Sequence, residues 1–193
     1  MYGLEGNDYV TGGDDLDQIF GGAGDDIIYT SWGPEQADYG TETIGDGDFA
    51  SGGSGQDKIY GTDFDEFFFG GEGHDLIEAG QGRDILDGGT GDDDLDAGGG
   101  ADIIYGQEGD DRIRARNGDD RAYGGEGDDD IRGNAGDDDL YGGEGDDEIR
   151  GDDGDDDIWA GPGDDYVRGD AGSDIIRGEQ GDDILLGGTE KDG

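Results

Sequence analysis

The chain has 193 residues, of which 28% are hydrophobic and 48 are glycine, and its formal net charge at pH 7 is −45. So little apolar surface and so much self-repulsion exclude a conventional globular core, and a polyanion lacks the clustered Lys and Arg that nucleic-acid binding needs. Without Cys, no disulfide can replace the core, so bound cations are the expected stabilisers.

Two kinds of targeting segment are not predicted. No apolar run reaches the 18 or more residues of a membrane-spanning helix, so we expect no membrane span. The first residues lead directly into a repeat, and they do not predict a signal peptide.

Residues 1–29 contain three nine-residue repeats, which begin at Gly3, Gly12 and Gly21. Glycine is typical of positions one, two and four, where it permits positive φ and close approach of the backbone. Position six is Asp and position eight is a branched apolar residue, as a half-buried strand requires. A fixed period of this kind predicts a solenoid, in which each unit buries its apolar residue against its neighbours.

The repeat is interrupted at residues 30–42, which contain Trp32 and Pro34 and cannot be written as a nonapeptide. We predict a loop that protrudes from the stack. Large aromatic side chains more often pack than bind, so we interpret Trp32, Tyr39 and Phe49 as residues that cover neighbouring strands, in preference to a binding site.

Residues 43–193 form one continuous array: a degenerate unit at 43–51, nonapeptides without a slip over 52–186, and a partial unit at the end. The unit at 61–69 is irregular, because Phe64 replaces the fourth glycine and Glu66 replaces the aspartate. We predict that its turn binds metal poorly or not at all. The adjacent Phe67 and Phe69 could cover the inserted loop.

The period determines the expected fold. If each unit makes one turn and one short strand, two units complete a coil, and successive coils stack as parallel strands about 4.8 Å apart. We therefore predict an all-β fold: a parallel β-roll, which is a right-handed, β-helix-like solenoid with two nonapeptide repeats per coil and about ten coils. Residues 1–29, 30–42 and 43–193 would belong to one solenoid domain. The expected core consists of the residues at position eight: Ile77, Leu86, Leu95, Ile104, Ile113, Ala122, Ile131, Leu140, Ile149, Ile158, Val167, Ile176 and Leu185.

The pattern GGxGxDxUx is clearest at residues 124–150, which read GGEGDDDIR, GNAGDDDLY and GGEGDDEIR. It resembles the RTX (repeats-in-toxin) calcium-binding β-roll family, including serralysin- and haemolysin-type repeats. The resemblance implies calcium ions between the turns of successive coils. Each ion would be held by the carbonyl oxygens of positions two and four and the Asp of one turn, and by the carbonyl oxygens of positions one and three and the Asp of the next.

Calcium prefers six to eight hard oxygen ligands in flexible geometry, and a glycine turn with one carboxylate supplies such ligands. By the resemblance, one site comprises Gly125, Gly127 and Asp129 with Gly142, Glu144 and Asp147, where Glu144 gives its backbone oxygen only. At most about 16 ions would bind, bringing about +32 against the formal −45. The predicted metal ligands at position six are Asp8, Asp17, Asp26, Asp48, Asp57, Asp75, Asp84, Asp93, Asp102, Asp111, Asp120, Asp129, Asp138, Asp147, Asp156, Asp165, Asp174, Asp183 and Asp192.

Two other positions are acidic or polar. The position-five carboxylates, such as Asp92, Asp110, Asp128 and Asp146, are interpreted as solvated surface charge. At position two, three polar residues that tolerate the glycine conformation are chemically reasonable, and three longer ones have no explanation from the sequence. The first three are Asn134, Asp152 and Asp170, and the others are Gln107, Arg116 and Glu179.

Sorting position nine by face gives two outward stripes. One stripe is aromatic and the other is basic: Tyr105, Tyr123, Tyr141 and Trp159 on one face, and Arg114, Arg132, Arg150 and Arg168 on the other. Stacked aromatic residues stabilise a sheet, and the arginines can pair with Asp130 and Glu148 two residues earlier. We favour these structural interpretations over a lateral interface or a glycan-binding strip.

The sequence favours binding over catalysis. The only histidine, His74, lies at a variable turn position, and there is no Cys, so neither a nucleophilic triad nor a histidine-rich metal centre can form. We do not expect an enzyme. Our leading hypothesis is an extracellular or cell-surface, bacterial β-roll that folds on binding calcium and serves as a stalk, an adhesive or a surface-fibre subunit. The alternative is an accessory module of a secreted enzyme or toxin. Further copies of the chain, end to end or side by side, and polysaccharide are the other partners considered.

Overall fold

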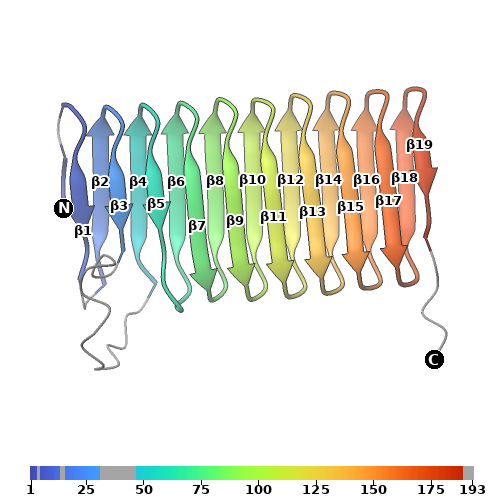
Figure 1. Cartoon of the computed structure of the whole chain (residues 1–193), viewed down its shortest axis with the longest axis horizontal. Coiled ribbons are helices and arrows are strands. Elements are labelled where there is room, and N and C mark those ends of the chain that lie inside the picture. The colour runs from blue at the N-terminus through green and yellow to red at the C-terminus, as the bar shows by residue number, and fades with distance from the viewer. Residues whose placement is uncertain (4, 14–15, 31–46, 189–193) are drawn as a thin grey trace.

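The computed structural model describes residues 1–3, 5–13, 16–30 and 47–188, and all statements below concern these residues. They form an elongated rod of two parallel sheets that face each other (Figure 1). The chain passes from one sheet to the other and back in each coil, so strands two apart in the chain are neighbours in space. The all-β parallel roll predicted from the period is confirmed.

The odd-numbered strands form a ten-stranded sheet, and the even-numbered strands form a nine-stranded one. The odd sheet consists of β1 (Tyr9–Thr11), β3 (Ile27–Tyr29), β5 (Lys58–Tyr60), β7 (Leu76–Gln81), β9 (Asp94–Gly99), β11 (Arg112–Asn117), β13 (Asp130–Ala135), β15 (Glu148–Asp153), β17 (Tyr166–Ala171) and β19 (Ile184–Leu186). The even sheet consists of β2 (Gln18–Ala23), β4 (Phe49–Ser54), β6 (Phe67–Glu72), β8 (Ile85–Thr90), β10 (Ile103–Glu108), β12 (Arg121–Glu126), β14 (Asp139–Glu144), β16 (Asp157–Pro162) and β18 (Ile175–Gln180).

The strands are longer than the sequence predicts. Most have six residues, which correspond to positions seven to nine of one unit and one to three of the next, so only positions four to six lie outside the strands. For example, Gln107 pairs with Gly125 and Glu108 pairs with Glu126. The glycine-rich half of each unit therefore belongs to the sheet, because stacking in register pairs its backbone with the same positions of the next coil.

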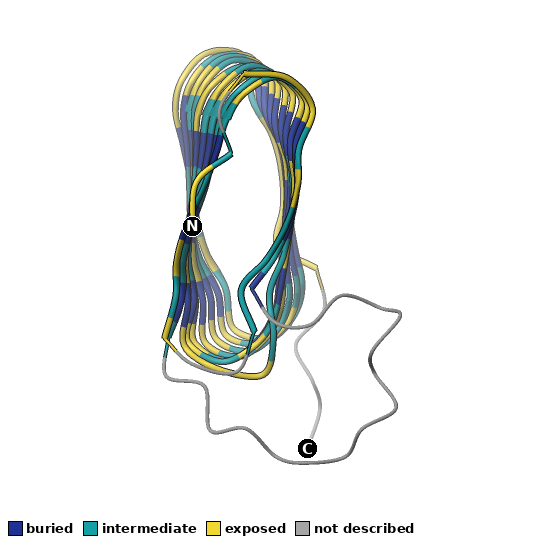
Figure 2. Cartoon of the chain, turned by 90° about the vertical axis from the view of Figure 1, so that its left-hand side faces the viewer, coloured by how far each residue is buried: buried dark blue, intermediate teal, exposed yellow. Residues whose placement is uncertain are grey.

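The core is a narrow double row along the rod, and Figure 2 shows the buried residues at the same level in coil after coil. Position-eight side chains from Ile77 to Val167 are fully buried, as predicted. Position one fills the space beside them with Gly or Ala, and Ala79, Ala97 and Ala115 are also fully buried. Ile176 is only partly buried, and Leu185 is 43% exposed, since no described coil packs over β18 and β19.

The coils before and after the interruption of the repeat stack on each other in register. Thr30, the first residue of the predicted loop, lies in a coil, where it is fully buried and its N–H donates to Tyr60 O at 3.0 Å. The coil resumes by Asp48, whose Oδ1 accepts the N–H of Asp17 at 2.7 Å. The rest of the predicted loop, Trp32 and Tyr39 included, lies outside the described residues. Phe49 packs between Phe20 and Phe69, with ring centroids 5.5 and 5.3 Å apart.

Candidate metal centre

The turns form two columns, one at each end of the strands, and their backbone carbonyls face neighbouring coils. Gly125 O and Gly127 O face the following turn so closely that Gly143 and Gly145, above them, have no room for a Cβ. Both of these glycines have positive φ, at 128° and 136°. Gly142 O faces in the opposite direction, toward Gly124. Oxygens of two successive turns therefore meet in the gap between the coils.

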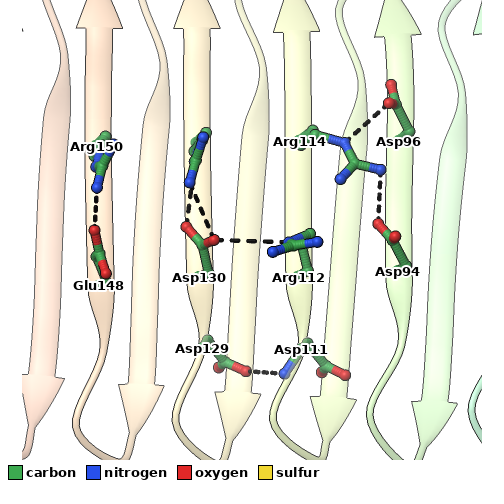
Figure 3. Close-up of polar contacts among 10 residues, drawn as sticks. Asp94, Asp96, Asp111, Arg112, Arg114, Asp129, Asp130, Glu148 and Arg150 are labelled. Carbon is green, nitrogen blue, oxygen red and sulfur yellow. Dashed lines mark hydrogen bonds and ion pairs between the residues drawn. The ribbon is translucent and has the colours of Figure 1, made fainter.

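The aspartates at position six connect the same gaps. The N–H of Asp111 donates to Asp129 Oδ1 at 2.8 Å (Figure 3), and the N–H of Asp129 donates to Asp147 Oδ1 at 2.9 Å. Each regular unit repeats this contact with the coil before it. One carboxylate oxygen of every such aspartate is therefore held in the gap by the backbone of the preceding turn.

The second carboxylate oxygen of these aspartates is buried and lacks a hydrogen-bond partner among the described residues. Such an oxygen is costly in the absence of water unless it has a partner. The oxygen atoms in this state are Oδ2 of Asp26, Asp57, Asp75, Asp84, Asp93, Asp102, Asp111, Asp120, Asp129, Asp138, Asp147, Asp156, Asp165 and Asp174. A row of orphaned carboxylate oxygens beside convergent carbonyls fits a hard divalent cation, and Ca²⁺ in particular.

The predicted ligand set is brought together by this geometry. Asp129 and Asp147 are 2% exposed and come from successive coils of the same column. Glu144 O accepts the N–H of Gly127 at 2.7 Å, so this backbone oxygen faces the preceding turn, while its side chain is exposed. No group of three or more His, Cys, Asp or Glu side chains suited to a metal occurs among the described residues, so backbone oxygens would have to supply most of the ligands.

The predicted aspartates outside the regular stack differ from these. Asp8, Asp17 and Asp183 are only half-buried. Asp48 is 7% exposed, and Asp192 lies outside the described residues. Position six is thus a buried position from Asp57 to Asp165, which excludes its interpretation as surface decoration.

Burial raises the pKa of these carboxyl groups. The pKa of Asp84 and that of Asp129 are each raised to about 8, mainly because burial disfavours the charged form. A backbone N–H lowers each pKa, and neighbouring aspartates raise it further. The pKa of Asp93 and that of Asp138 are raised to about 7 for the same reasons. In the absence of a cation, protonation would therefore be the other way to neutralise these buried carboxylates.

We expect acid to substitute for calcium. The pKa of these aspartates in the folded chain lies above the ordinary value of 3.8, so protonation stabilises the fold. This contribution is fully present below pH about 4 and is lost as the pH rises through about 6 to 8. Metal-free protein should accordingly gain sheet signal in circular dichroism on acidification to pH about 4 and lose it again by pH about 8. Sheet content that does not increase in acid would contradict this explanation.

The position-five residues form a second ladder, which the sequence interpretation missed. Asp92, Asp110, Asp128 and Asp146 are exposed, as predicted. However, Asp110 N–H donates to Asp92 Oδ1 at 3.1 Å, and Asp128 N–H donates to Asp110 Oδ1 at 2.9 Å. His74 occupies this position too, and its Nδ1 accepts the N–H of Asp92 at 2.8 Å. These side chains stabilise the turns from outside.

In the regular units, position two adopts the left-handed backbone even where it is not glycine. Among the described residues, seven at position two are not glycine, and all of them except Thr62 have φ between 71° and 85°. Two of the unexplained long side chains reach a position-nine Asp of the preceding coil: Gln107 Nε2 donates to Asp87 at 3.2 Å, and Arg116 Nε donates to Asp96 at 2.9 Å. Nothing in the structure explains Glu179.

Both outward stripes exist as predicted. The rings of Tyr105, Tyr123, Tyr141 and Trp159 stack with centroids 5.1, 4.7 and 4.6 Å apart, and the Arg177 guanidinium lies 4.9 Å from the Trp159 ring. Because the ring faces cover one another, a glycan could contact mainly their edges.

The arginine stripe is an ion-pair lattice (Figure 3). Arg132 pairs with Asp130 at 3.2 Å, and Arg150 pairs with Glu148. Arg114 instead contacts two carboxylates of the neighbouring strand β9, Asp94 and Asp96. The structural interpretation of this stripe is therefore supported.

Comparison with known proteins agrees with this geometry. A scan against protein families matches the RTX calcium-binding nonapeptide repeat over residues 2–34 and, in overlapping segments, over 44–192. A search of curated proteins found no match.

The described residues include no helix that is long and apolar enough to cross a membrane. Since the matched repeats cover nearly the whole chain, and their aspartates and glycines are those that converge between the coils, the chain belongs to the RTX calcium-binding nonapeptide repeat family.

Proposed function

We propose that this chain is an extracellular structural β-roll that folds when calcium binds between its coils. The observation that supports the proposal is a series of buried Oδ2 atoms in both columns of turns, from Asp26 to Asp174, that have no hydrogen-bond partner within the described part of the chain. In the regular turns, the position-six carboxylates and the carbonyls of positions one to four would hold the ions. The ions would supply the positive charge that this polyanion lacks.

The calcium concentration outside cells is high enough to drive this calcium-dependent folding. Extracellular calcium modules typically bind with dissociation constants of about 10⁻⁴ to 10⁻³ M, so sites of this class are empty at cytosolic calcium and fill after export. The chain would remain unfolded during export and become a rigid rod outside. A rod with a continuous, narrow core suits a stalk, an adhesive spacer or a subunit of a surface fibre. The proposal includes no catalytic role.

Limited proteolysis across the calcium gradient tests this proposal. At submicromolar free calcium the chain should be degraded throughout, whereas at about 1 mM free calcium residues 47–188 should survive as one protected fragment. Magnesium at the same concentration is the matched control, because it demands stricter octahedral geometry and should not protect. Equal protection with and without calcium would refute the proposal.

The alternative role is that of an accessory module that assists the export, folding or polysaccharide binding of a secreted enzyme or toxin. Polysaccharide and further copies of the chain stay predicted partners. The aromatic stripe offers one hollow for the former, about 460 Å³ in volume, lined by Tyr141, Trp159, Gly143, Glu144 and Pro162 among others.

A further inference from the structure

One turn holds a carboxylate in a different way from all the regular ones. Glu66, at position six of the unit 61–69, is 1% exposed. Its Oε1 accepts hydrogen bonds from Thr62 Oγ1 at 2.6 Å and from Thr30 Oγ1 at 3.0 Å, and its Oε2 accepts the N–H of Thr62 at 2.9 Å. Both carboxylate oxygens are therefore satisfied by the protein.

This arrangement contrasts with the regular column. The aspartates of the same column from Asp84 to Asp174 each keep one buried oxygen without a hydrogen-bond partner among the described residues. Glu66 does not belong to that series. It keeps the other feature of the column, since its N–H donates to Asp84 Oδ1 at 2.8 Å. The turn is thus stacked like the others, but its carboxylate has no oxygen left over for a cation.

The backbone of this turn also differs. Thr62 and Phe64 occupy positions two and four, where regular units have glycine or, at position two, another residue with positive φ, and neither Thr62 nor Phe64 has positive φ. In the regular unit at 124–132, Gly125 and Gly127 adopt φ of 130° and 128°. The turn at 61–66 therefore lacks the positive-φ backbone that accompanies the partnerless aspartate oxygens in the regular turns. Its residues do not fit a calcium ion.

The contacts of Glu66 join successive coils. Thr30 belongs to the coil before this turn, is fully buried, and is the last described residue before position 47. A hydroxyl donor from Thr30 and two donors from Thr62 replace the positive charge that a cation would bring to a buried carboxylate. These hydrogen bonds stabilise the buried Glu66 carboxylate independently of the calcium concentration.

We propose that the turn at 61–66 is a calcium-free staple: Glu66, held by the hydroxyls of Thr30 and Thr62, takes the place of an ion in this column of turns. This inference rests on the proposed function, because it assumes that the regular turns bind calcium. It assigns the irregular unit a positive role in joining the coils on either side of the interruption in the repeat.

Calcium counting by native mass spectrometry tests the staple. The variant Thr62→Gly/Phe64→Gly/Glu66→Asp restores the regular pattern, and it should bind about one ion more than the wild type at saturating calcium. Asp84→Asn, in the next regular turn of the column, is the matched control and should bind fewer ions than the wild type. A restored variant that folds and binds the same number of ions as the wild type would overturn the proposal.

A second measurement remains informative if the restored variant does not fold. Thr30→Val and Thr62→Val should each lower the urea midpoint at saturating calcium while the number of bound ions stays unchanged. Loss of an ion in either variant would mean that the threonines support a metal site, which would also overturn the staple. If the wild type binds no calcium at all, the proposed function itself fails, and the two failures are thereby distinguished.

Discussion

Removal of calcium at pH about 8 is expected to unfold the whole rod. The described core is only a narrow double row, and the formal charge of −45 opposes compaction at every coil. Chelation should abolish the sheet signal in circular dichroism in a single cooperative step. In small-angle X-ray scattering, the radius of gyration should increase to about 47 Å, the value for an unfolded chain of this length.

Excess magnesium is the control for this experiment, and it should not restore the fold at equal ionic strength. Readdition of calcium should restore it, because folding and binding share one free energy. A chelated protein that keeps its sheet content and its melting temperature would show that cations between the coils do not stabilise the structure.

Asp129→Asn is expected to weaken the middle of the rod strongly, whereas Asp128→Asn should have almost no effect. Both substitutions keep the shape and one acceptor oxygen, but Asp129 is 2% exposed with an orphaned oxygen, and Asp128 is exposed. Asp129 Oδ1 lies in the gap to Asp111, and its N–H contacts Asp147 in the next gap. Removal of its charge should therefore weaken calcium binding on both sides.

The expected loss for Asp129→Asn is about 3 kcal/mol or more in the free energy of unfolding at saturating calcium, the contribution of one site filled at about 100 times its dissociation constant. Asp128→Asn should stay within about 0.5 kcal/mol of the wild type. Urea midpoints at saturating calcium, together with ion counts, measure both. Equal losses for the two neighbours would contradict the assignment of position six as the ligand position.

The interruption shows how far a periodic sequence can be interpreted. The nine-residue period predicts that Asp48 is at position six. In the structure, Asp48 accepts a hydrogen bond from the backbone of Asp17, which lies 31 residues earlier instead of the usual 18. The sequence thus predicted where the stack resumes. It could not predict that Thr30 closes the coil and reaches Glu66, since that contact depends on which coils become neighbours once the intervening segment is passed.

The sequence by itself determined the properties that depend on position within a repeat. These are the two strands per coil, the buried row from Ile77 to Val167, the column of buried aspartates, and the stacking of residues such as Tyr123 and Tyr141. Each follows because equivalent positions must coincide when identical units stack.

Only the tertiary structure decided the properties that depend on contacts between coils. The sheets extend through positions two and three, Asp128 accepts a backbone N–H although it is exposed, and Gln107 reaches back to Asp87. The carboxylate of Glu66 accepts hydrogen bonds from two threonines, while one oxygen of Asp129 has no partner among the residues that the structure describes. The physical reason is that hydrogen bonding of a buried carboxylate depends on the donors that the neighbouring coil supplies, and a nine-residue pattern specifies the carboxylate but not its neighbours.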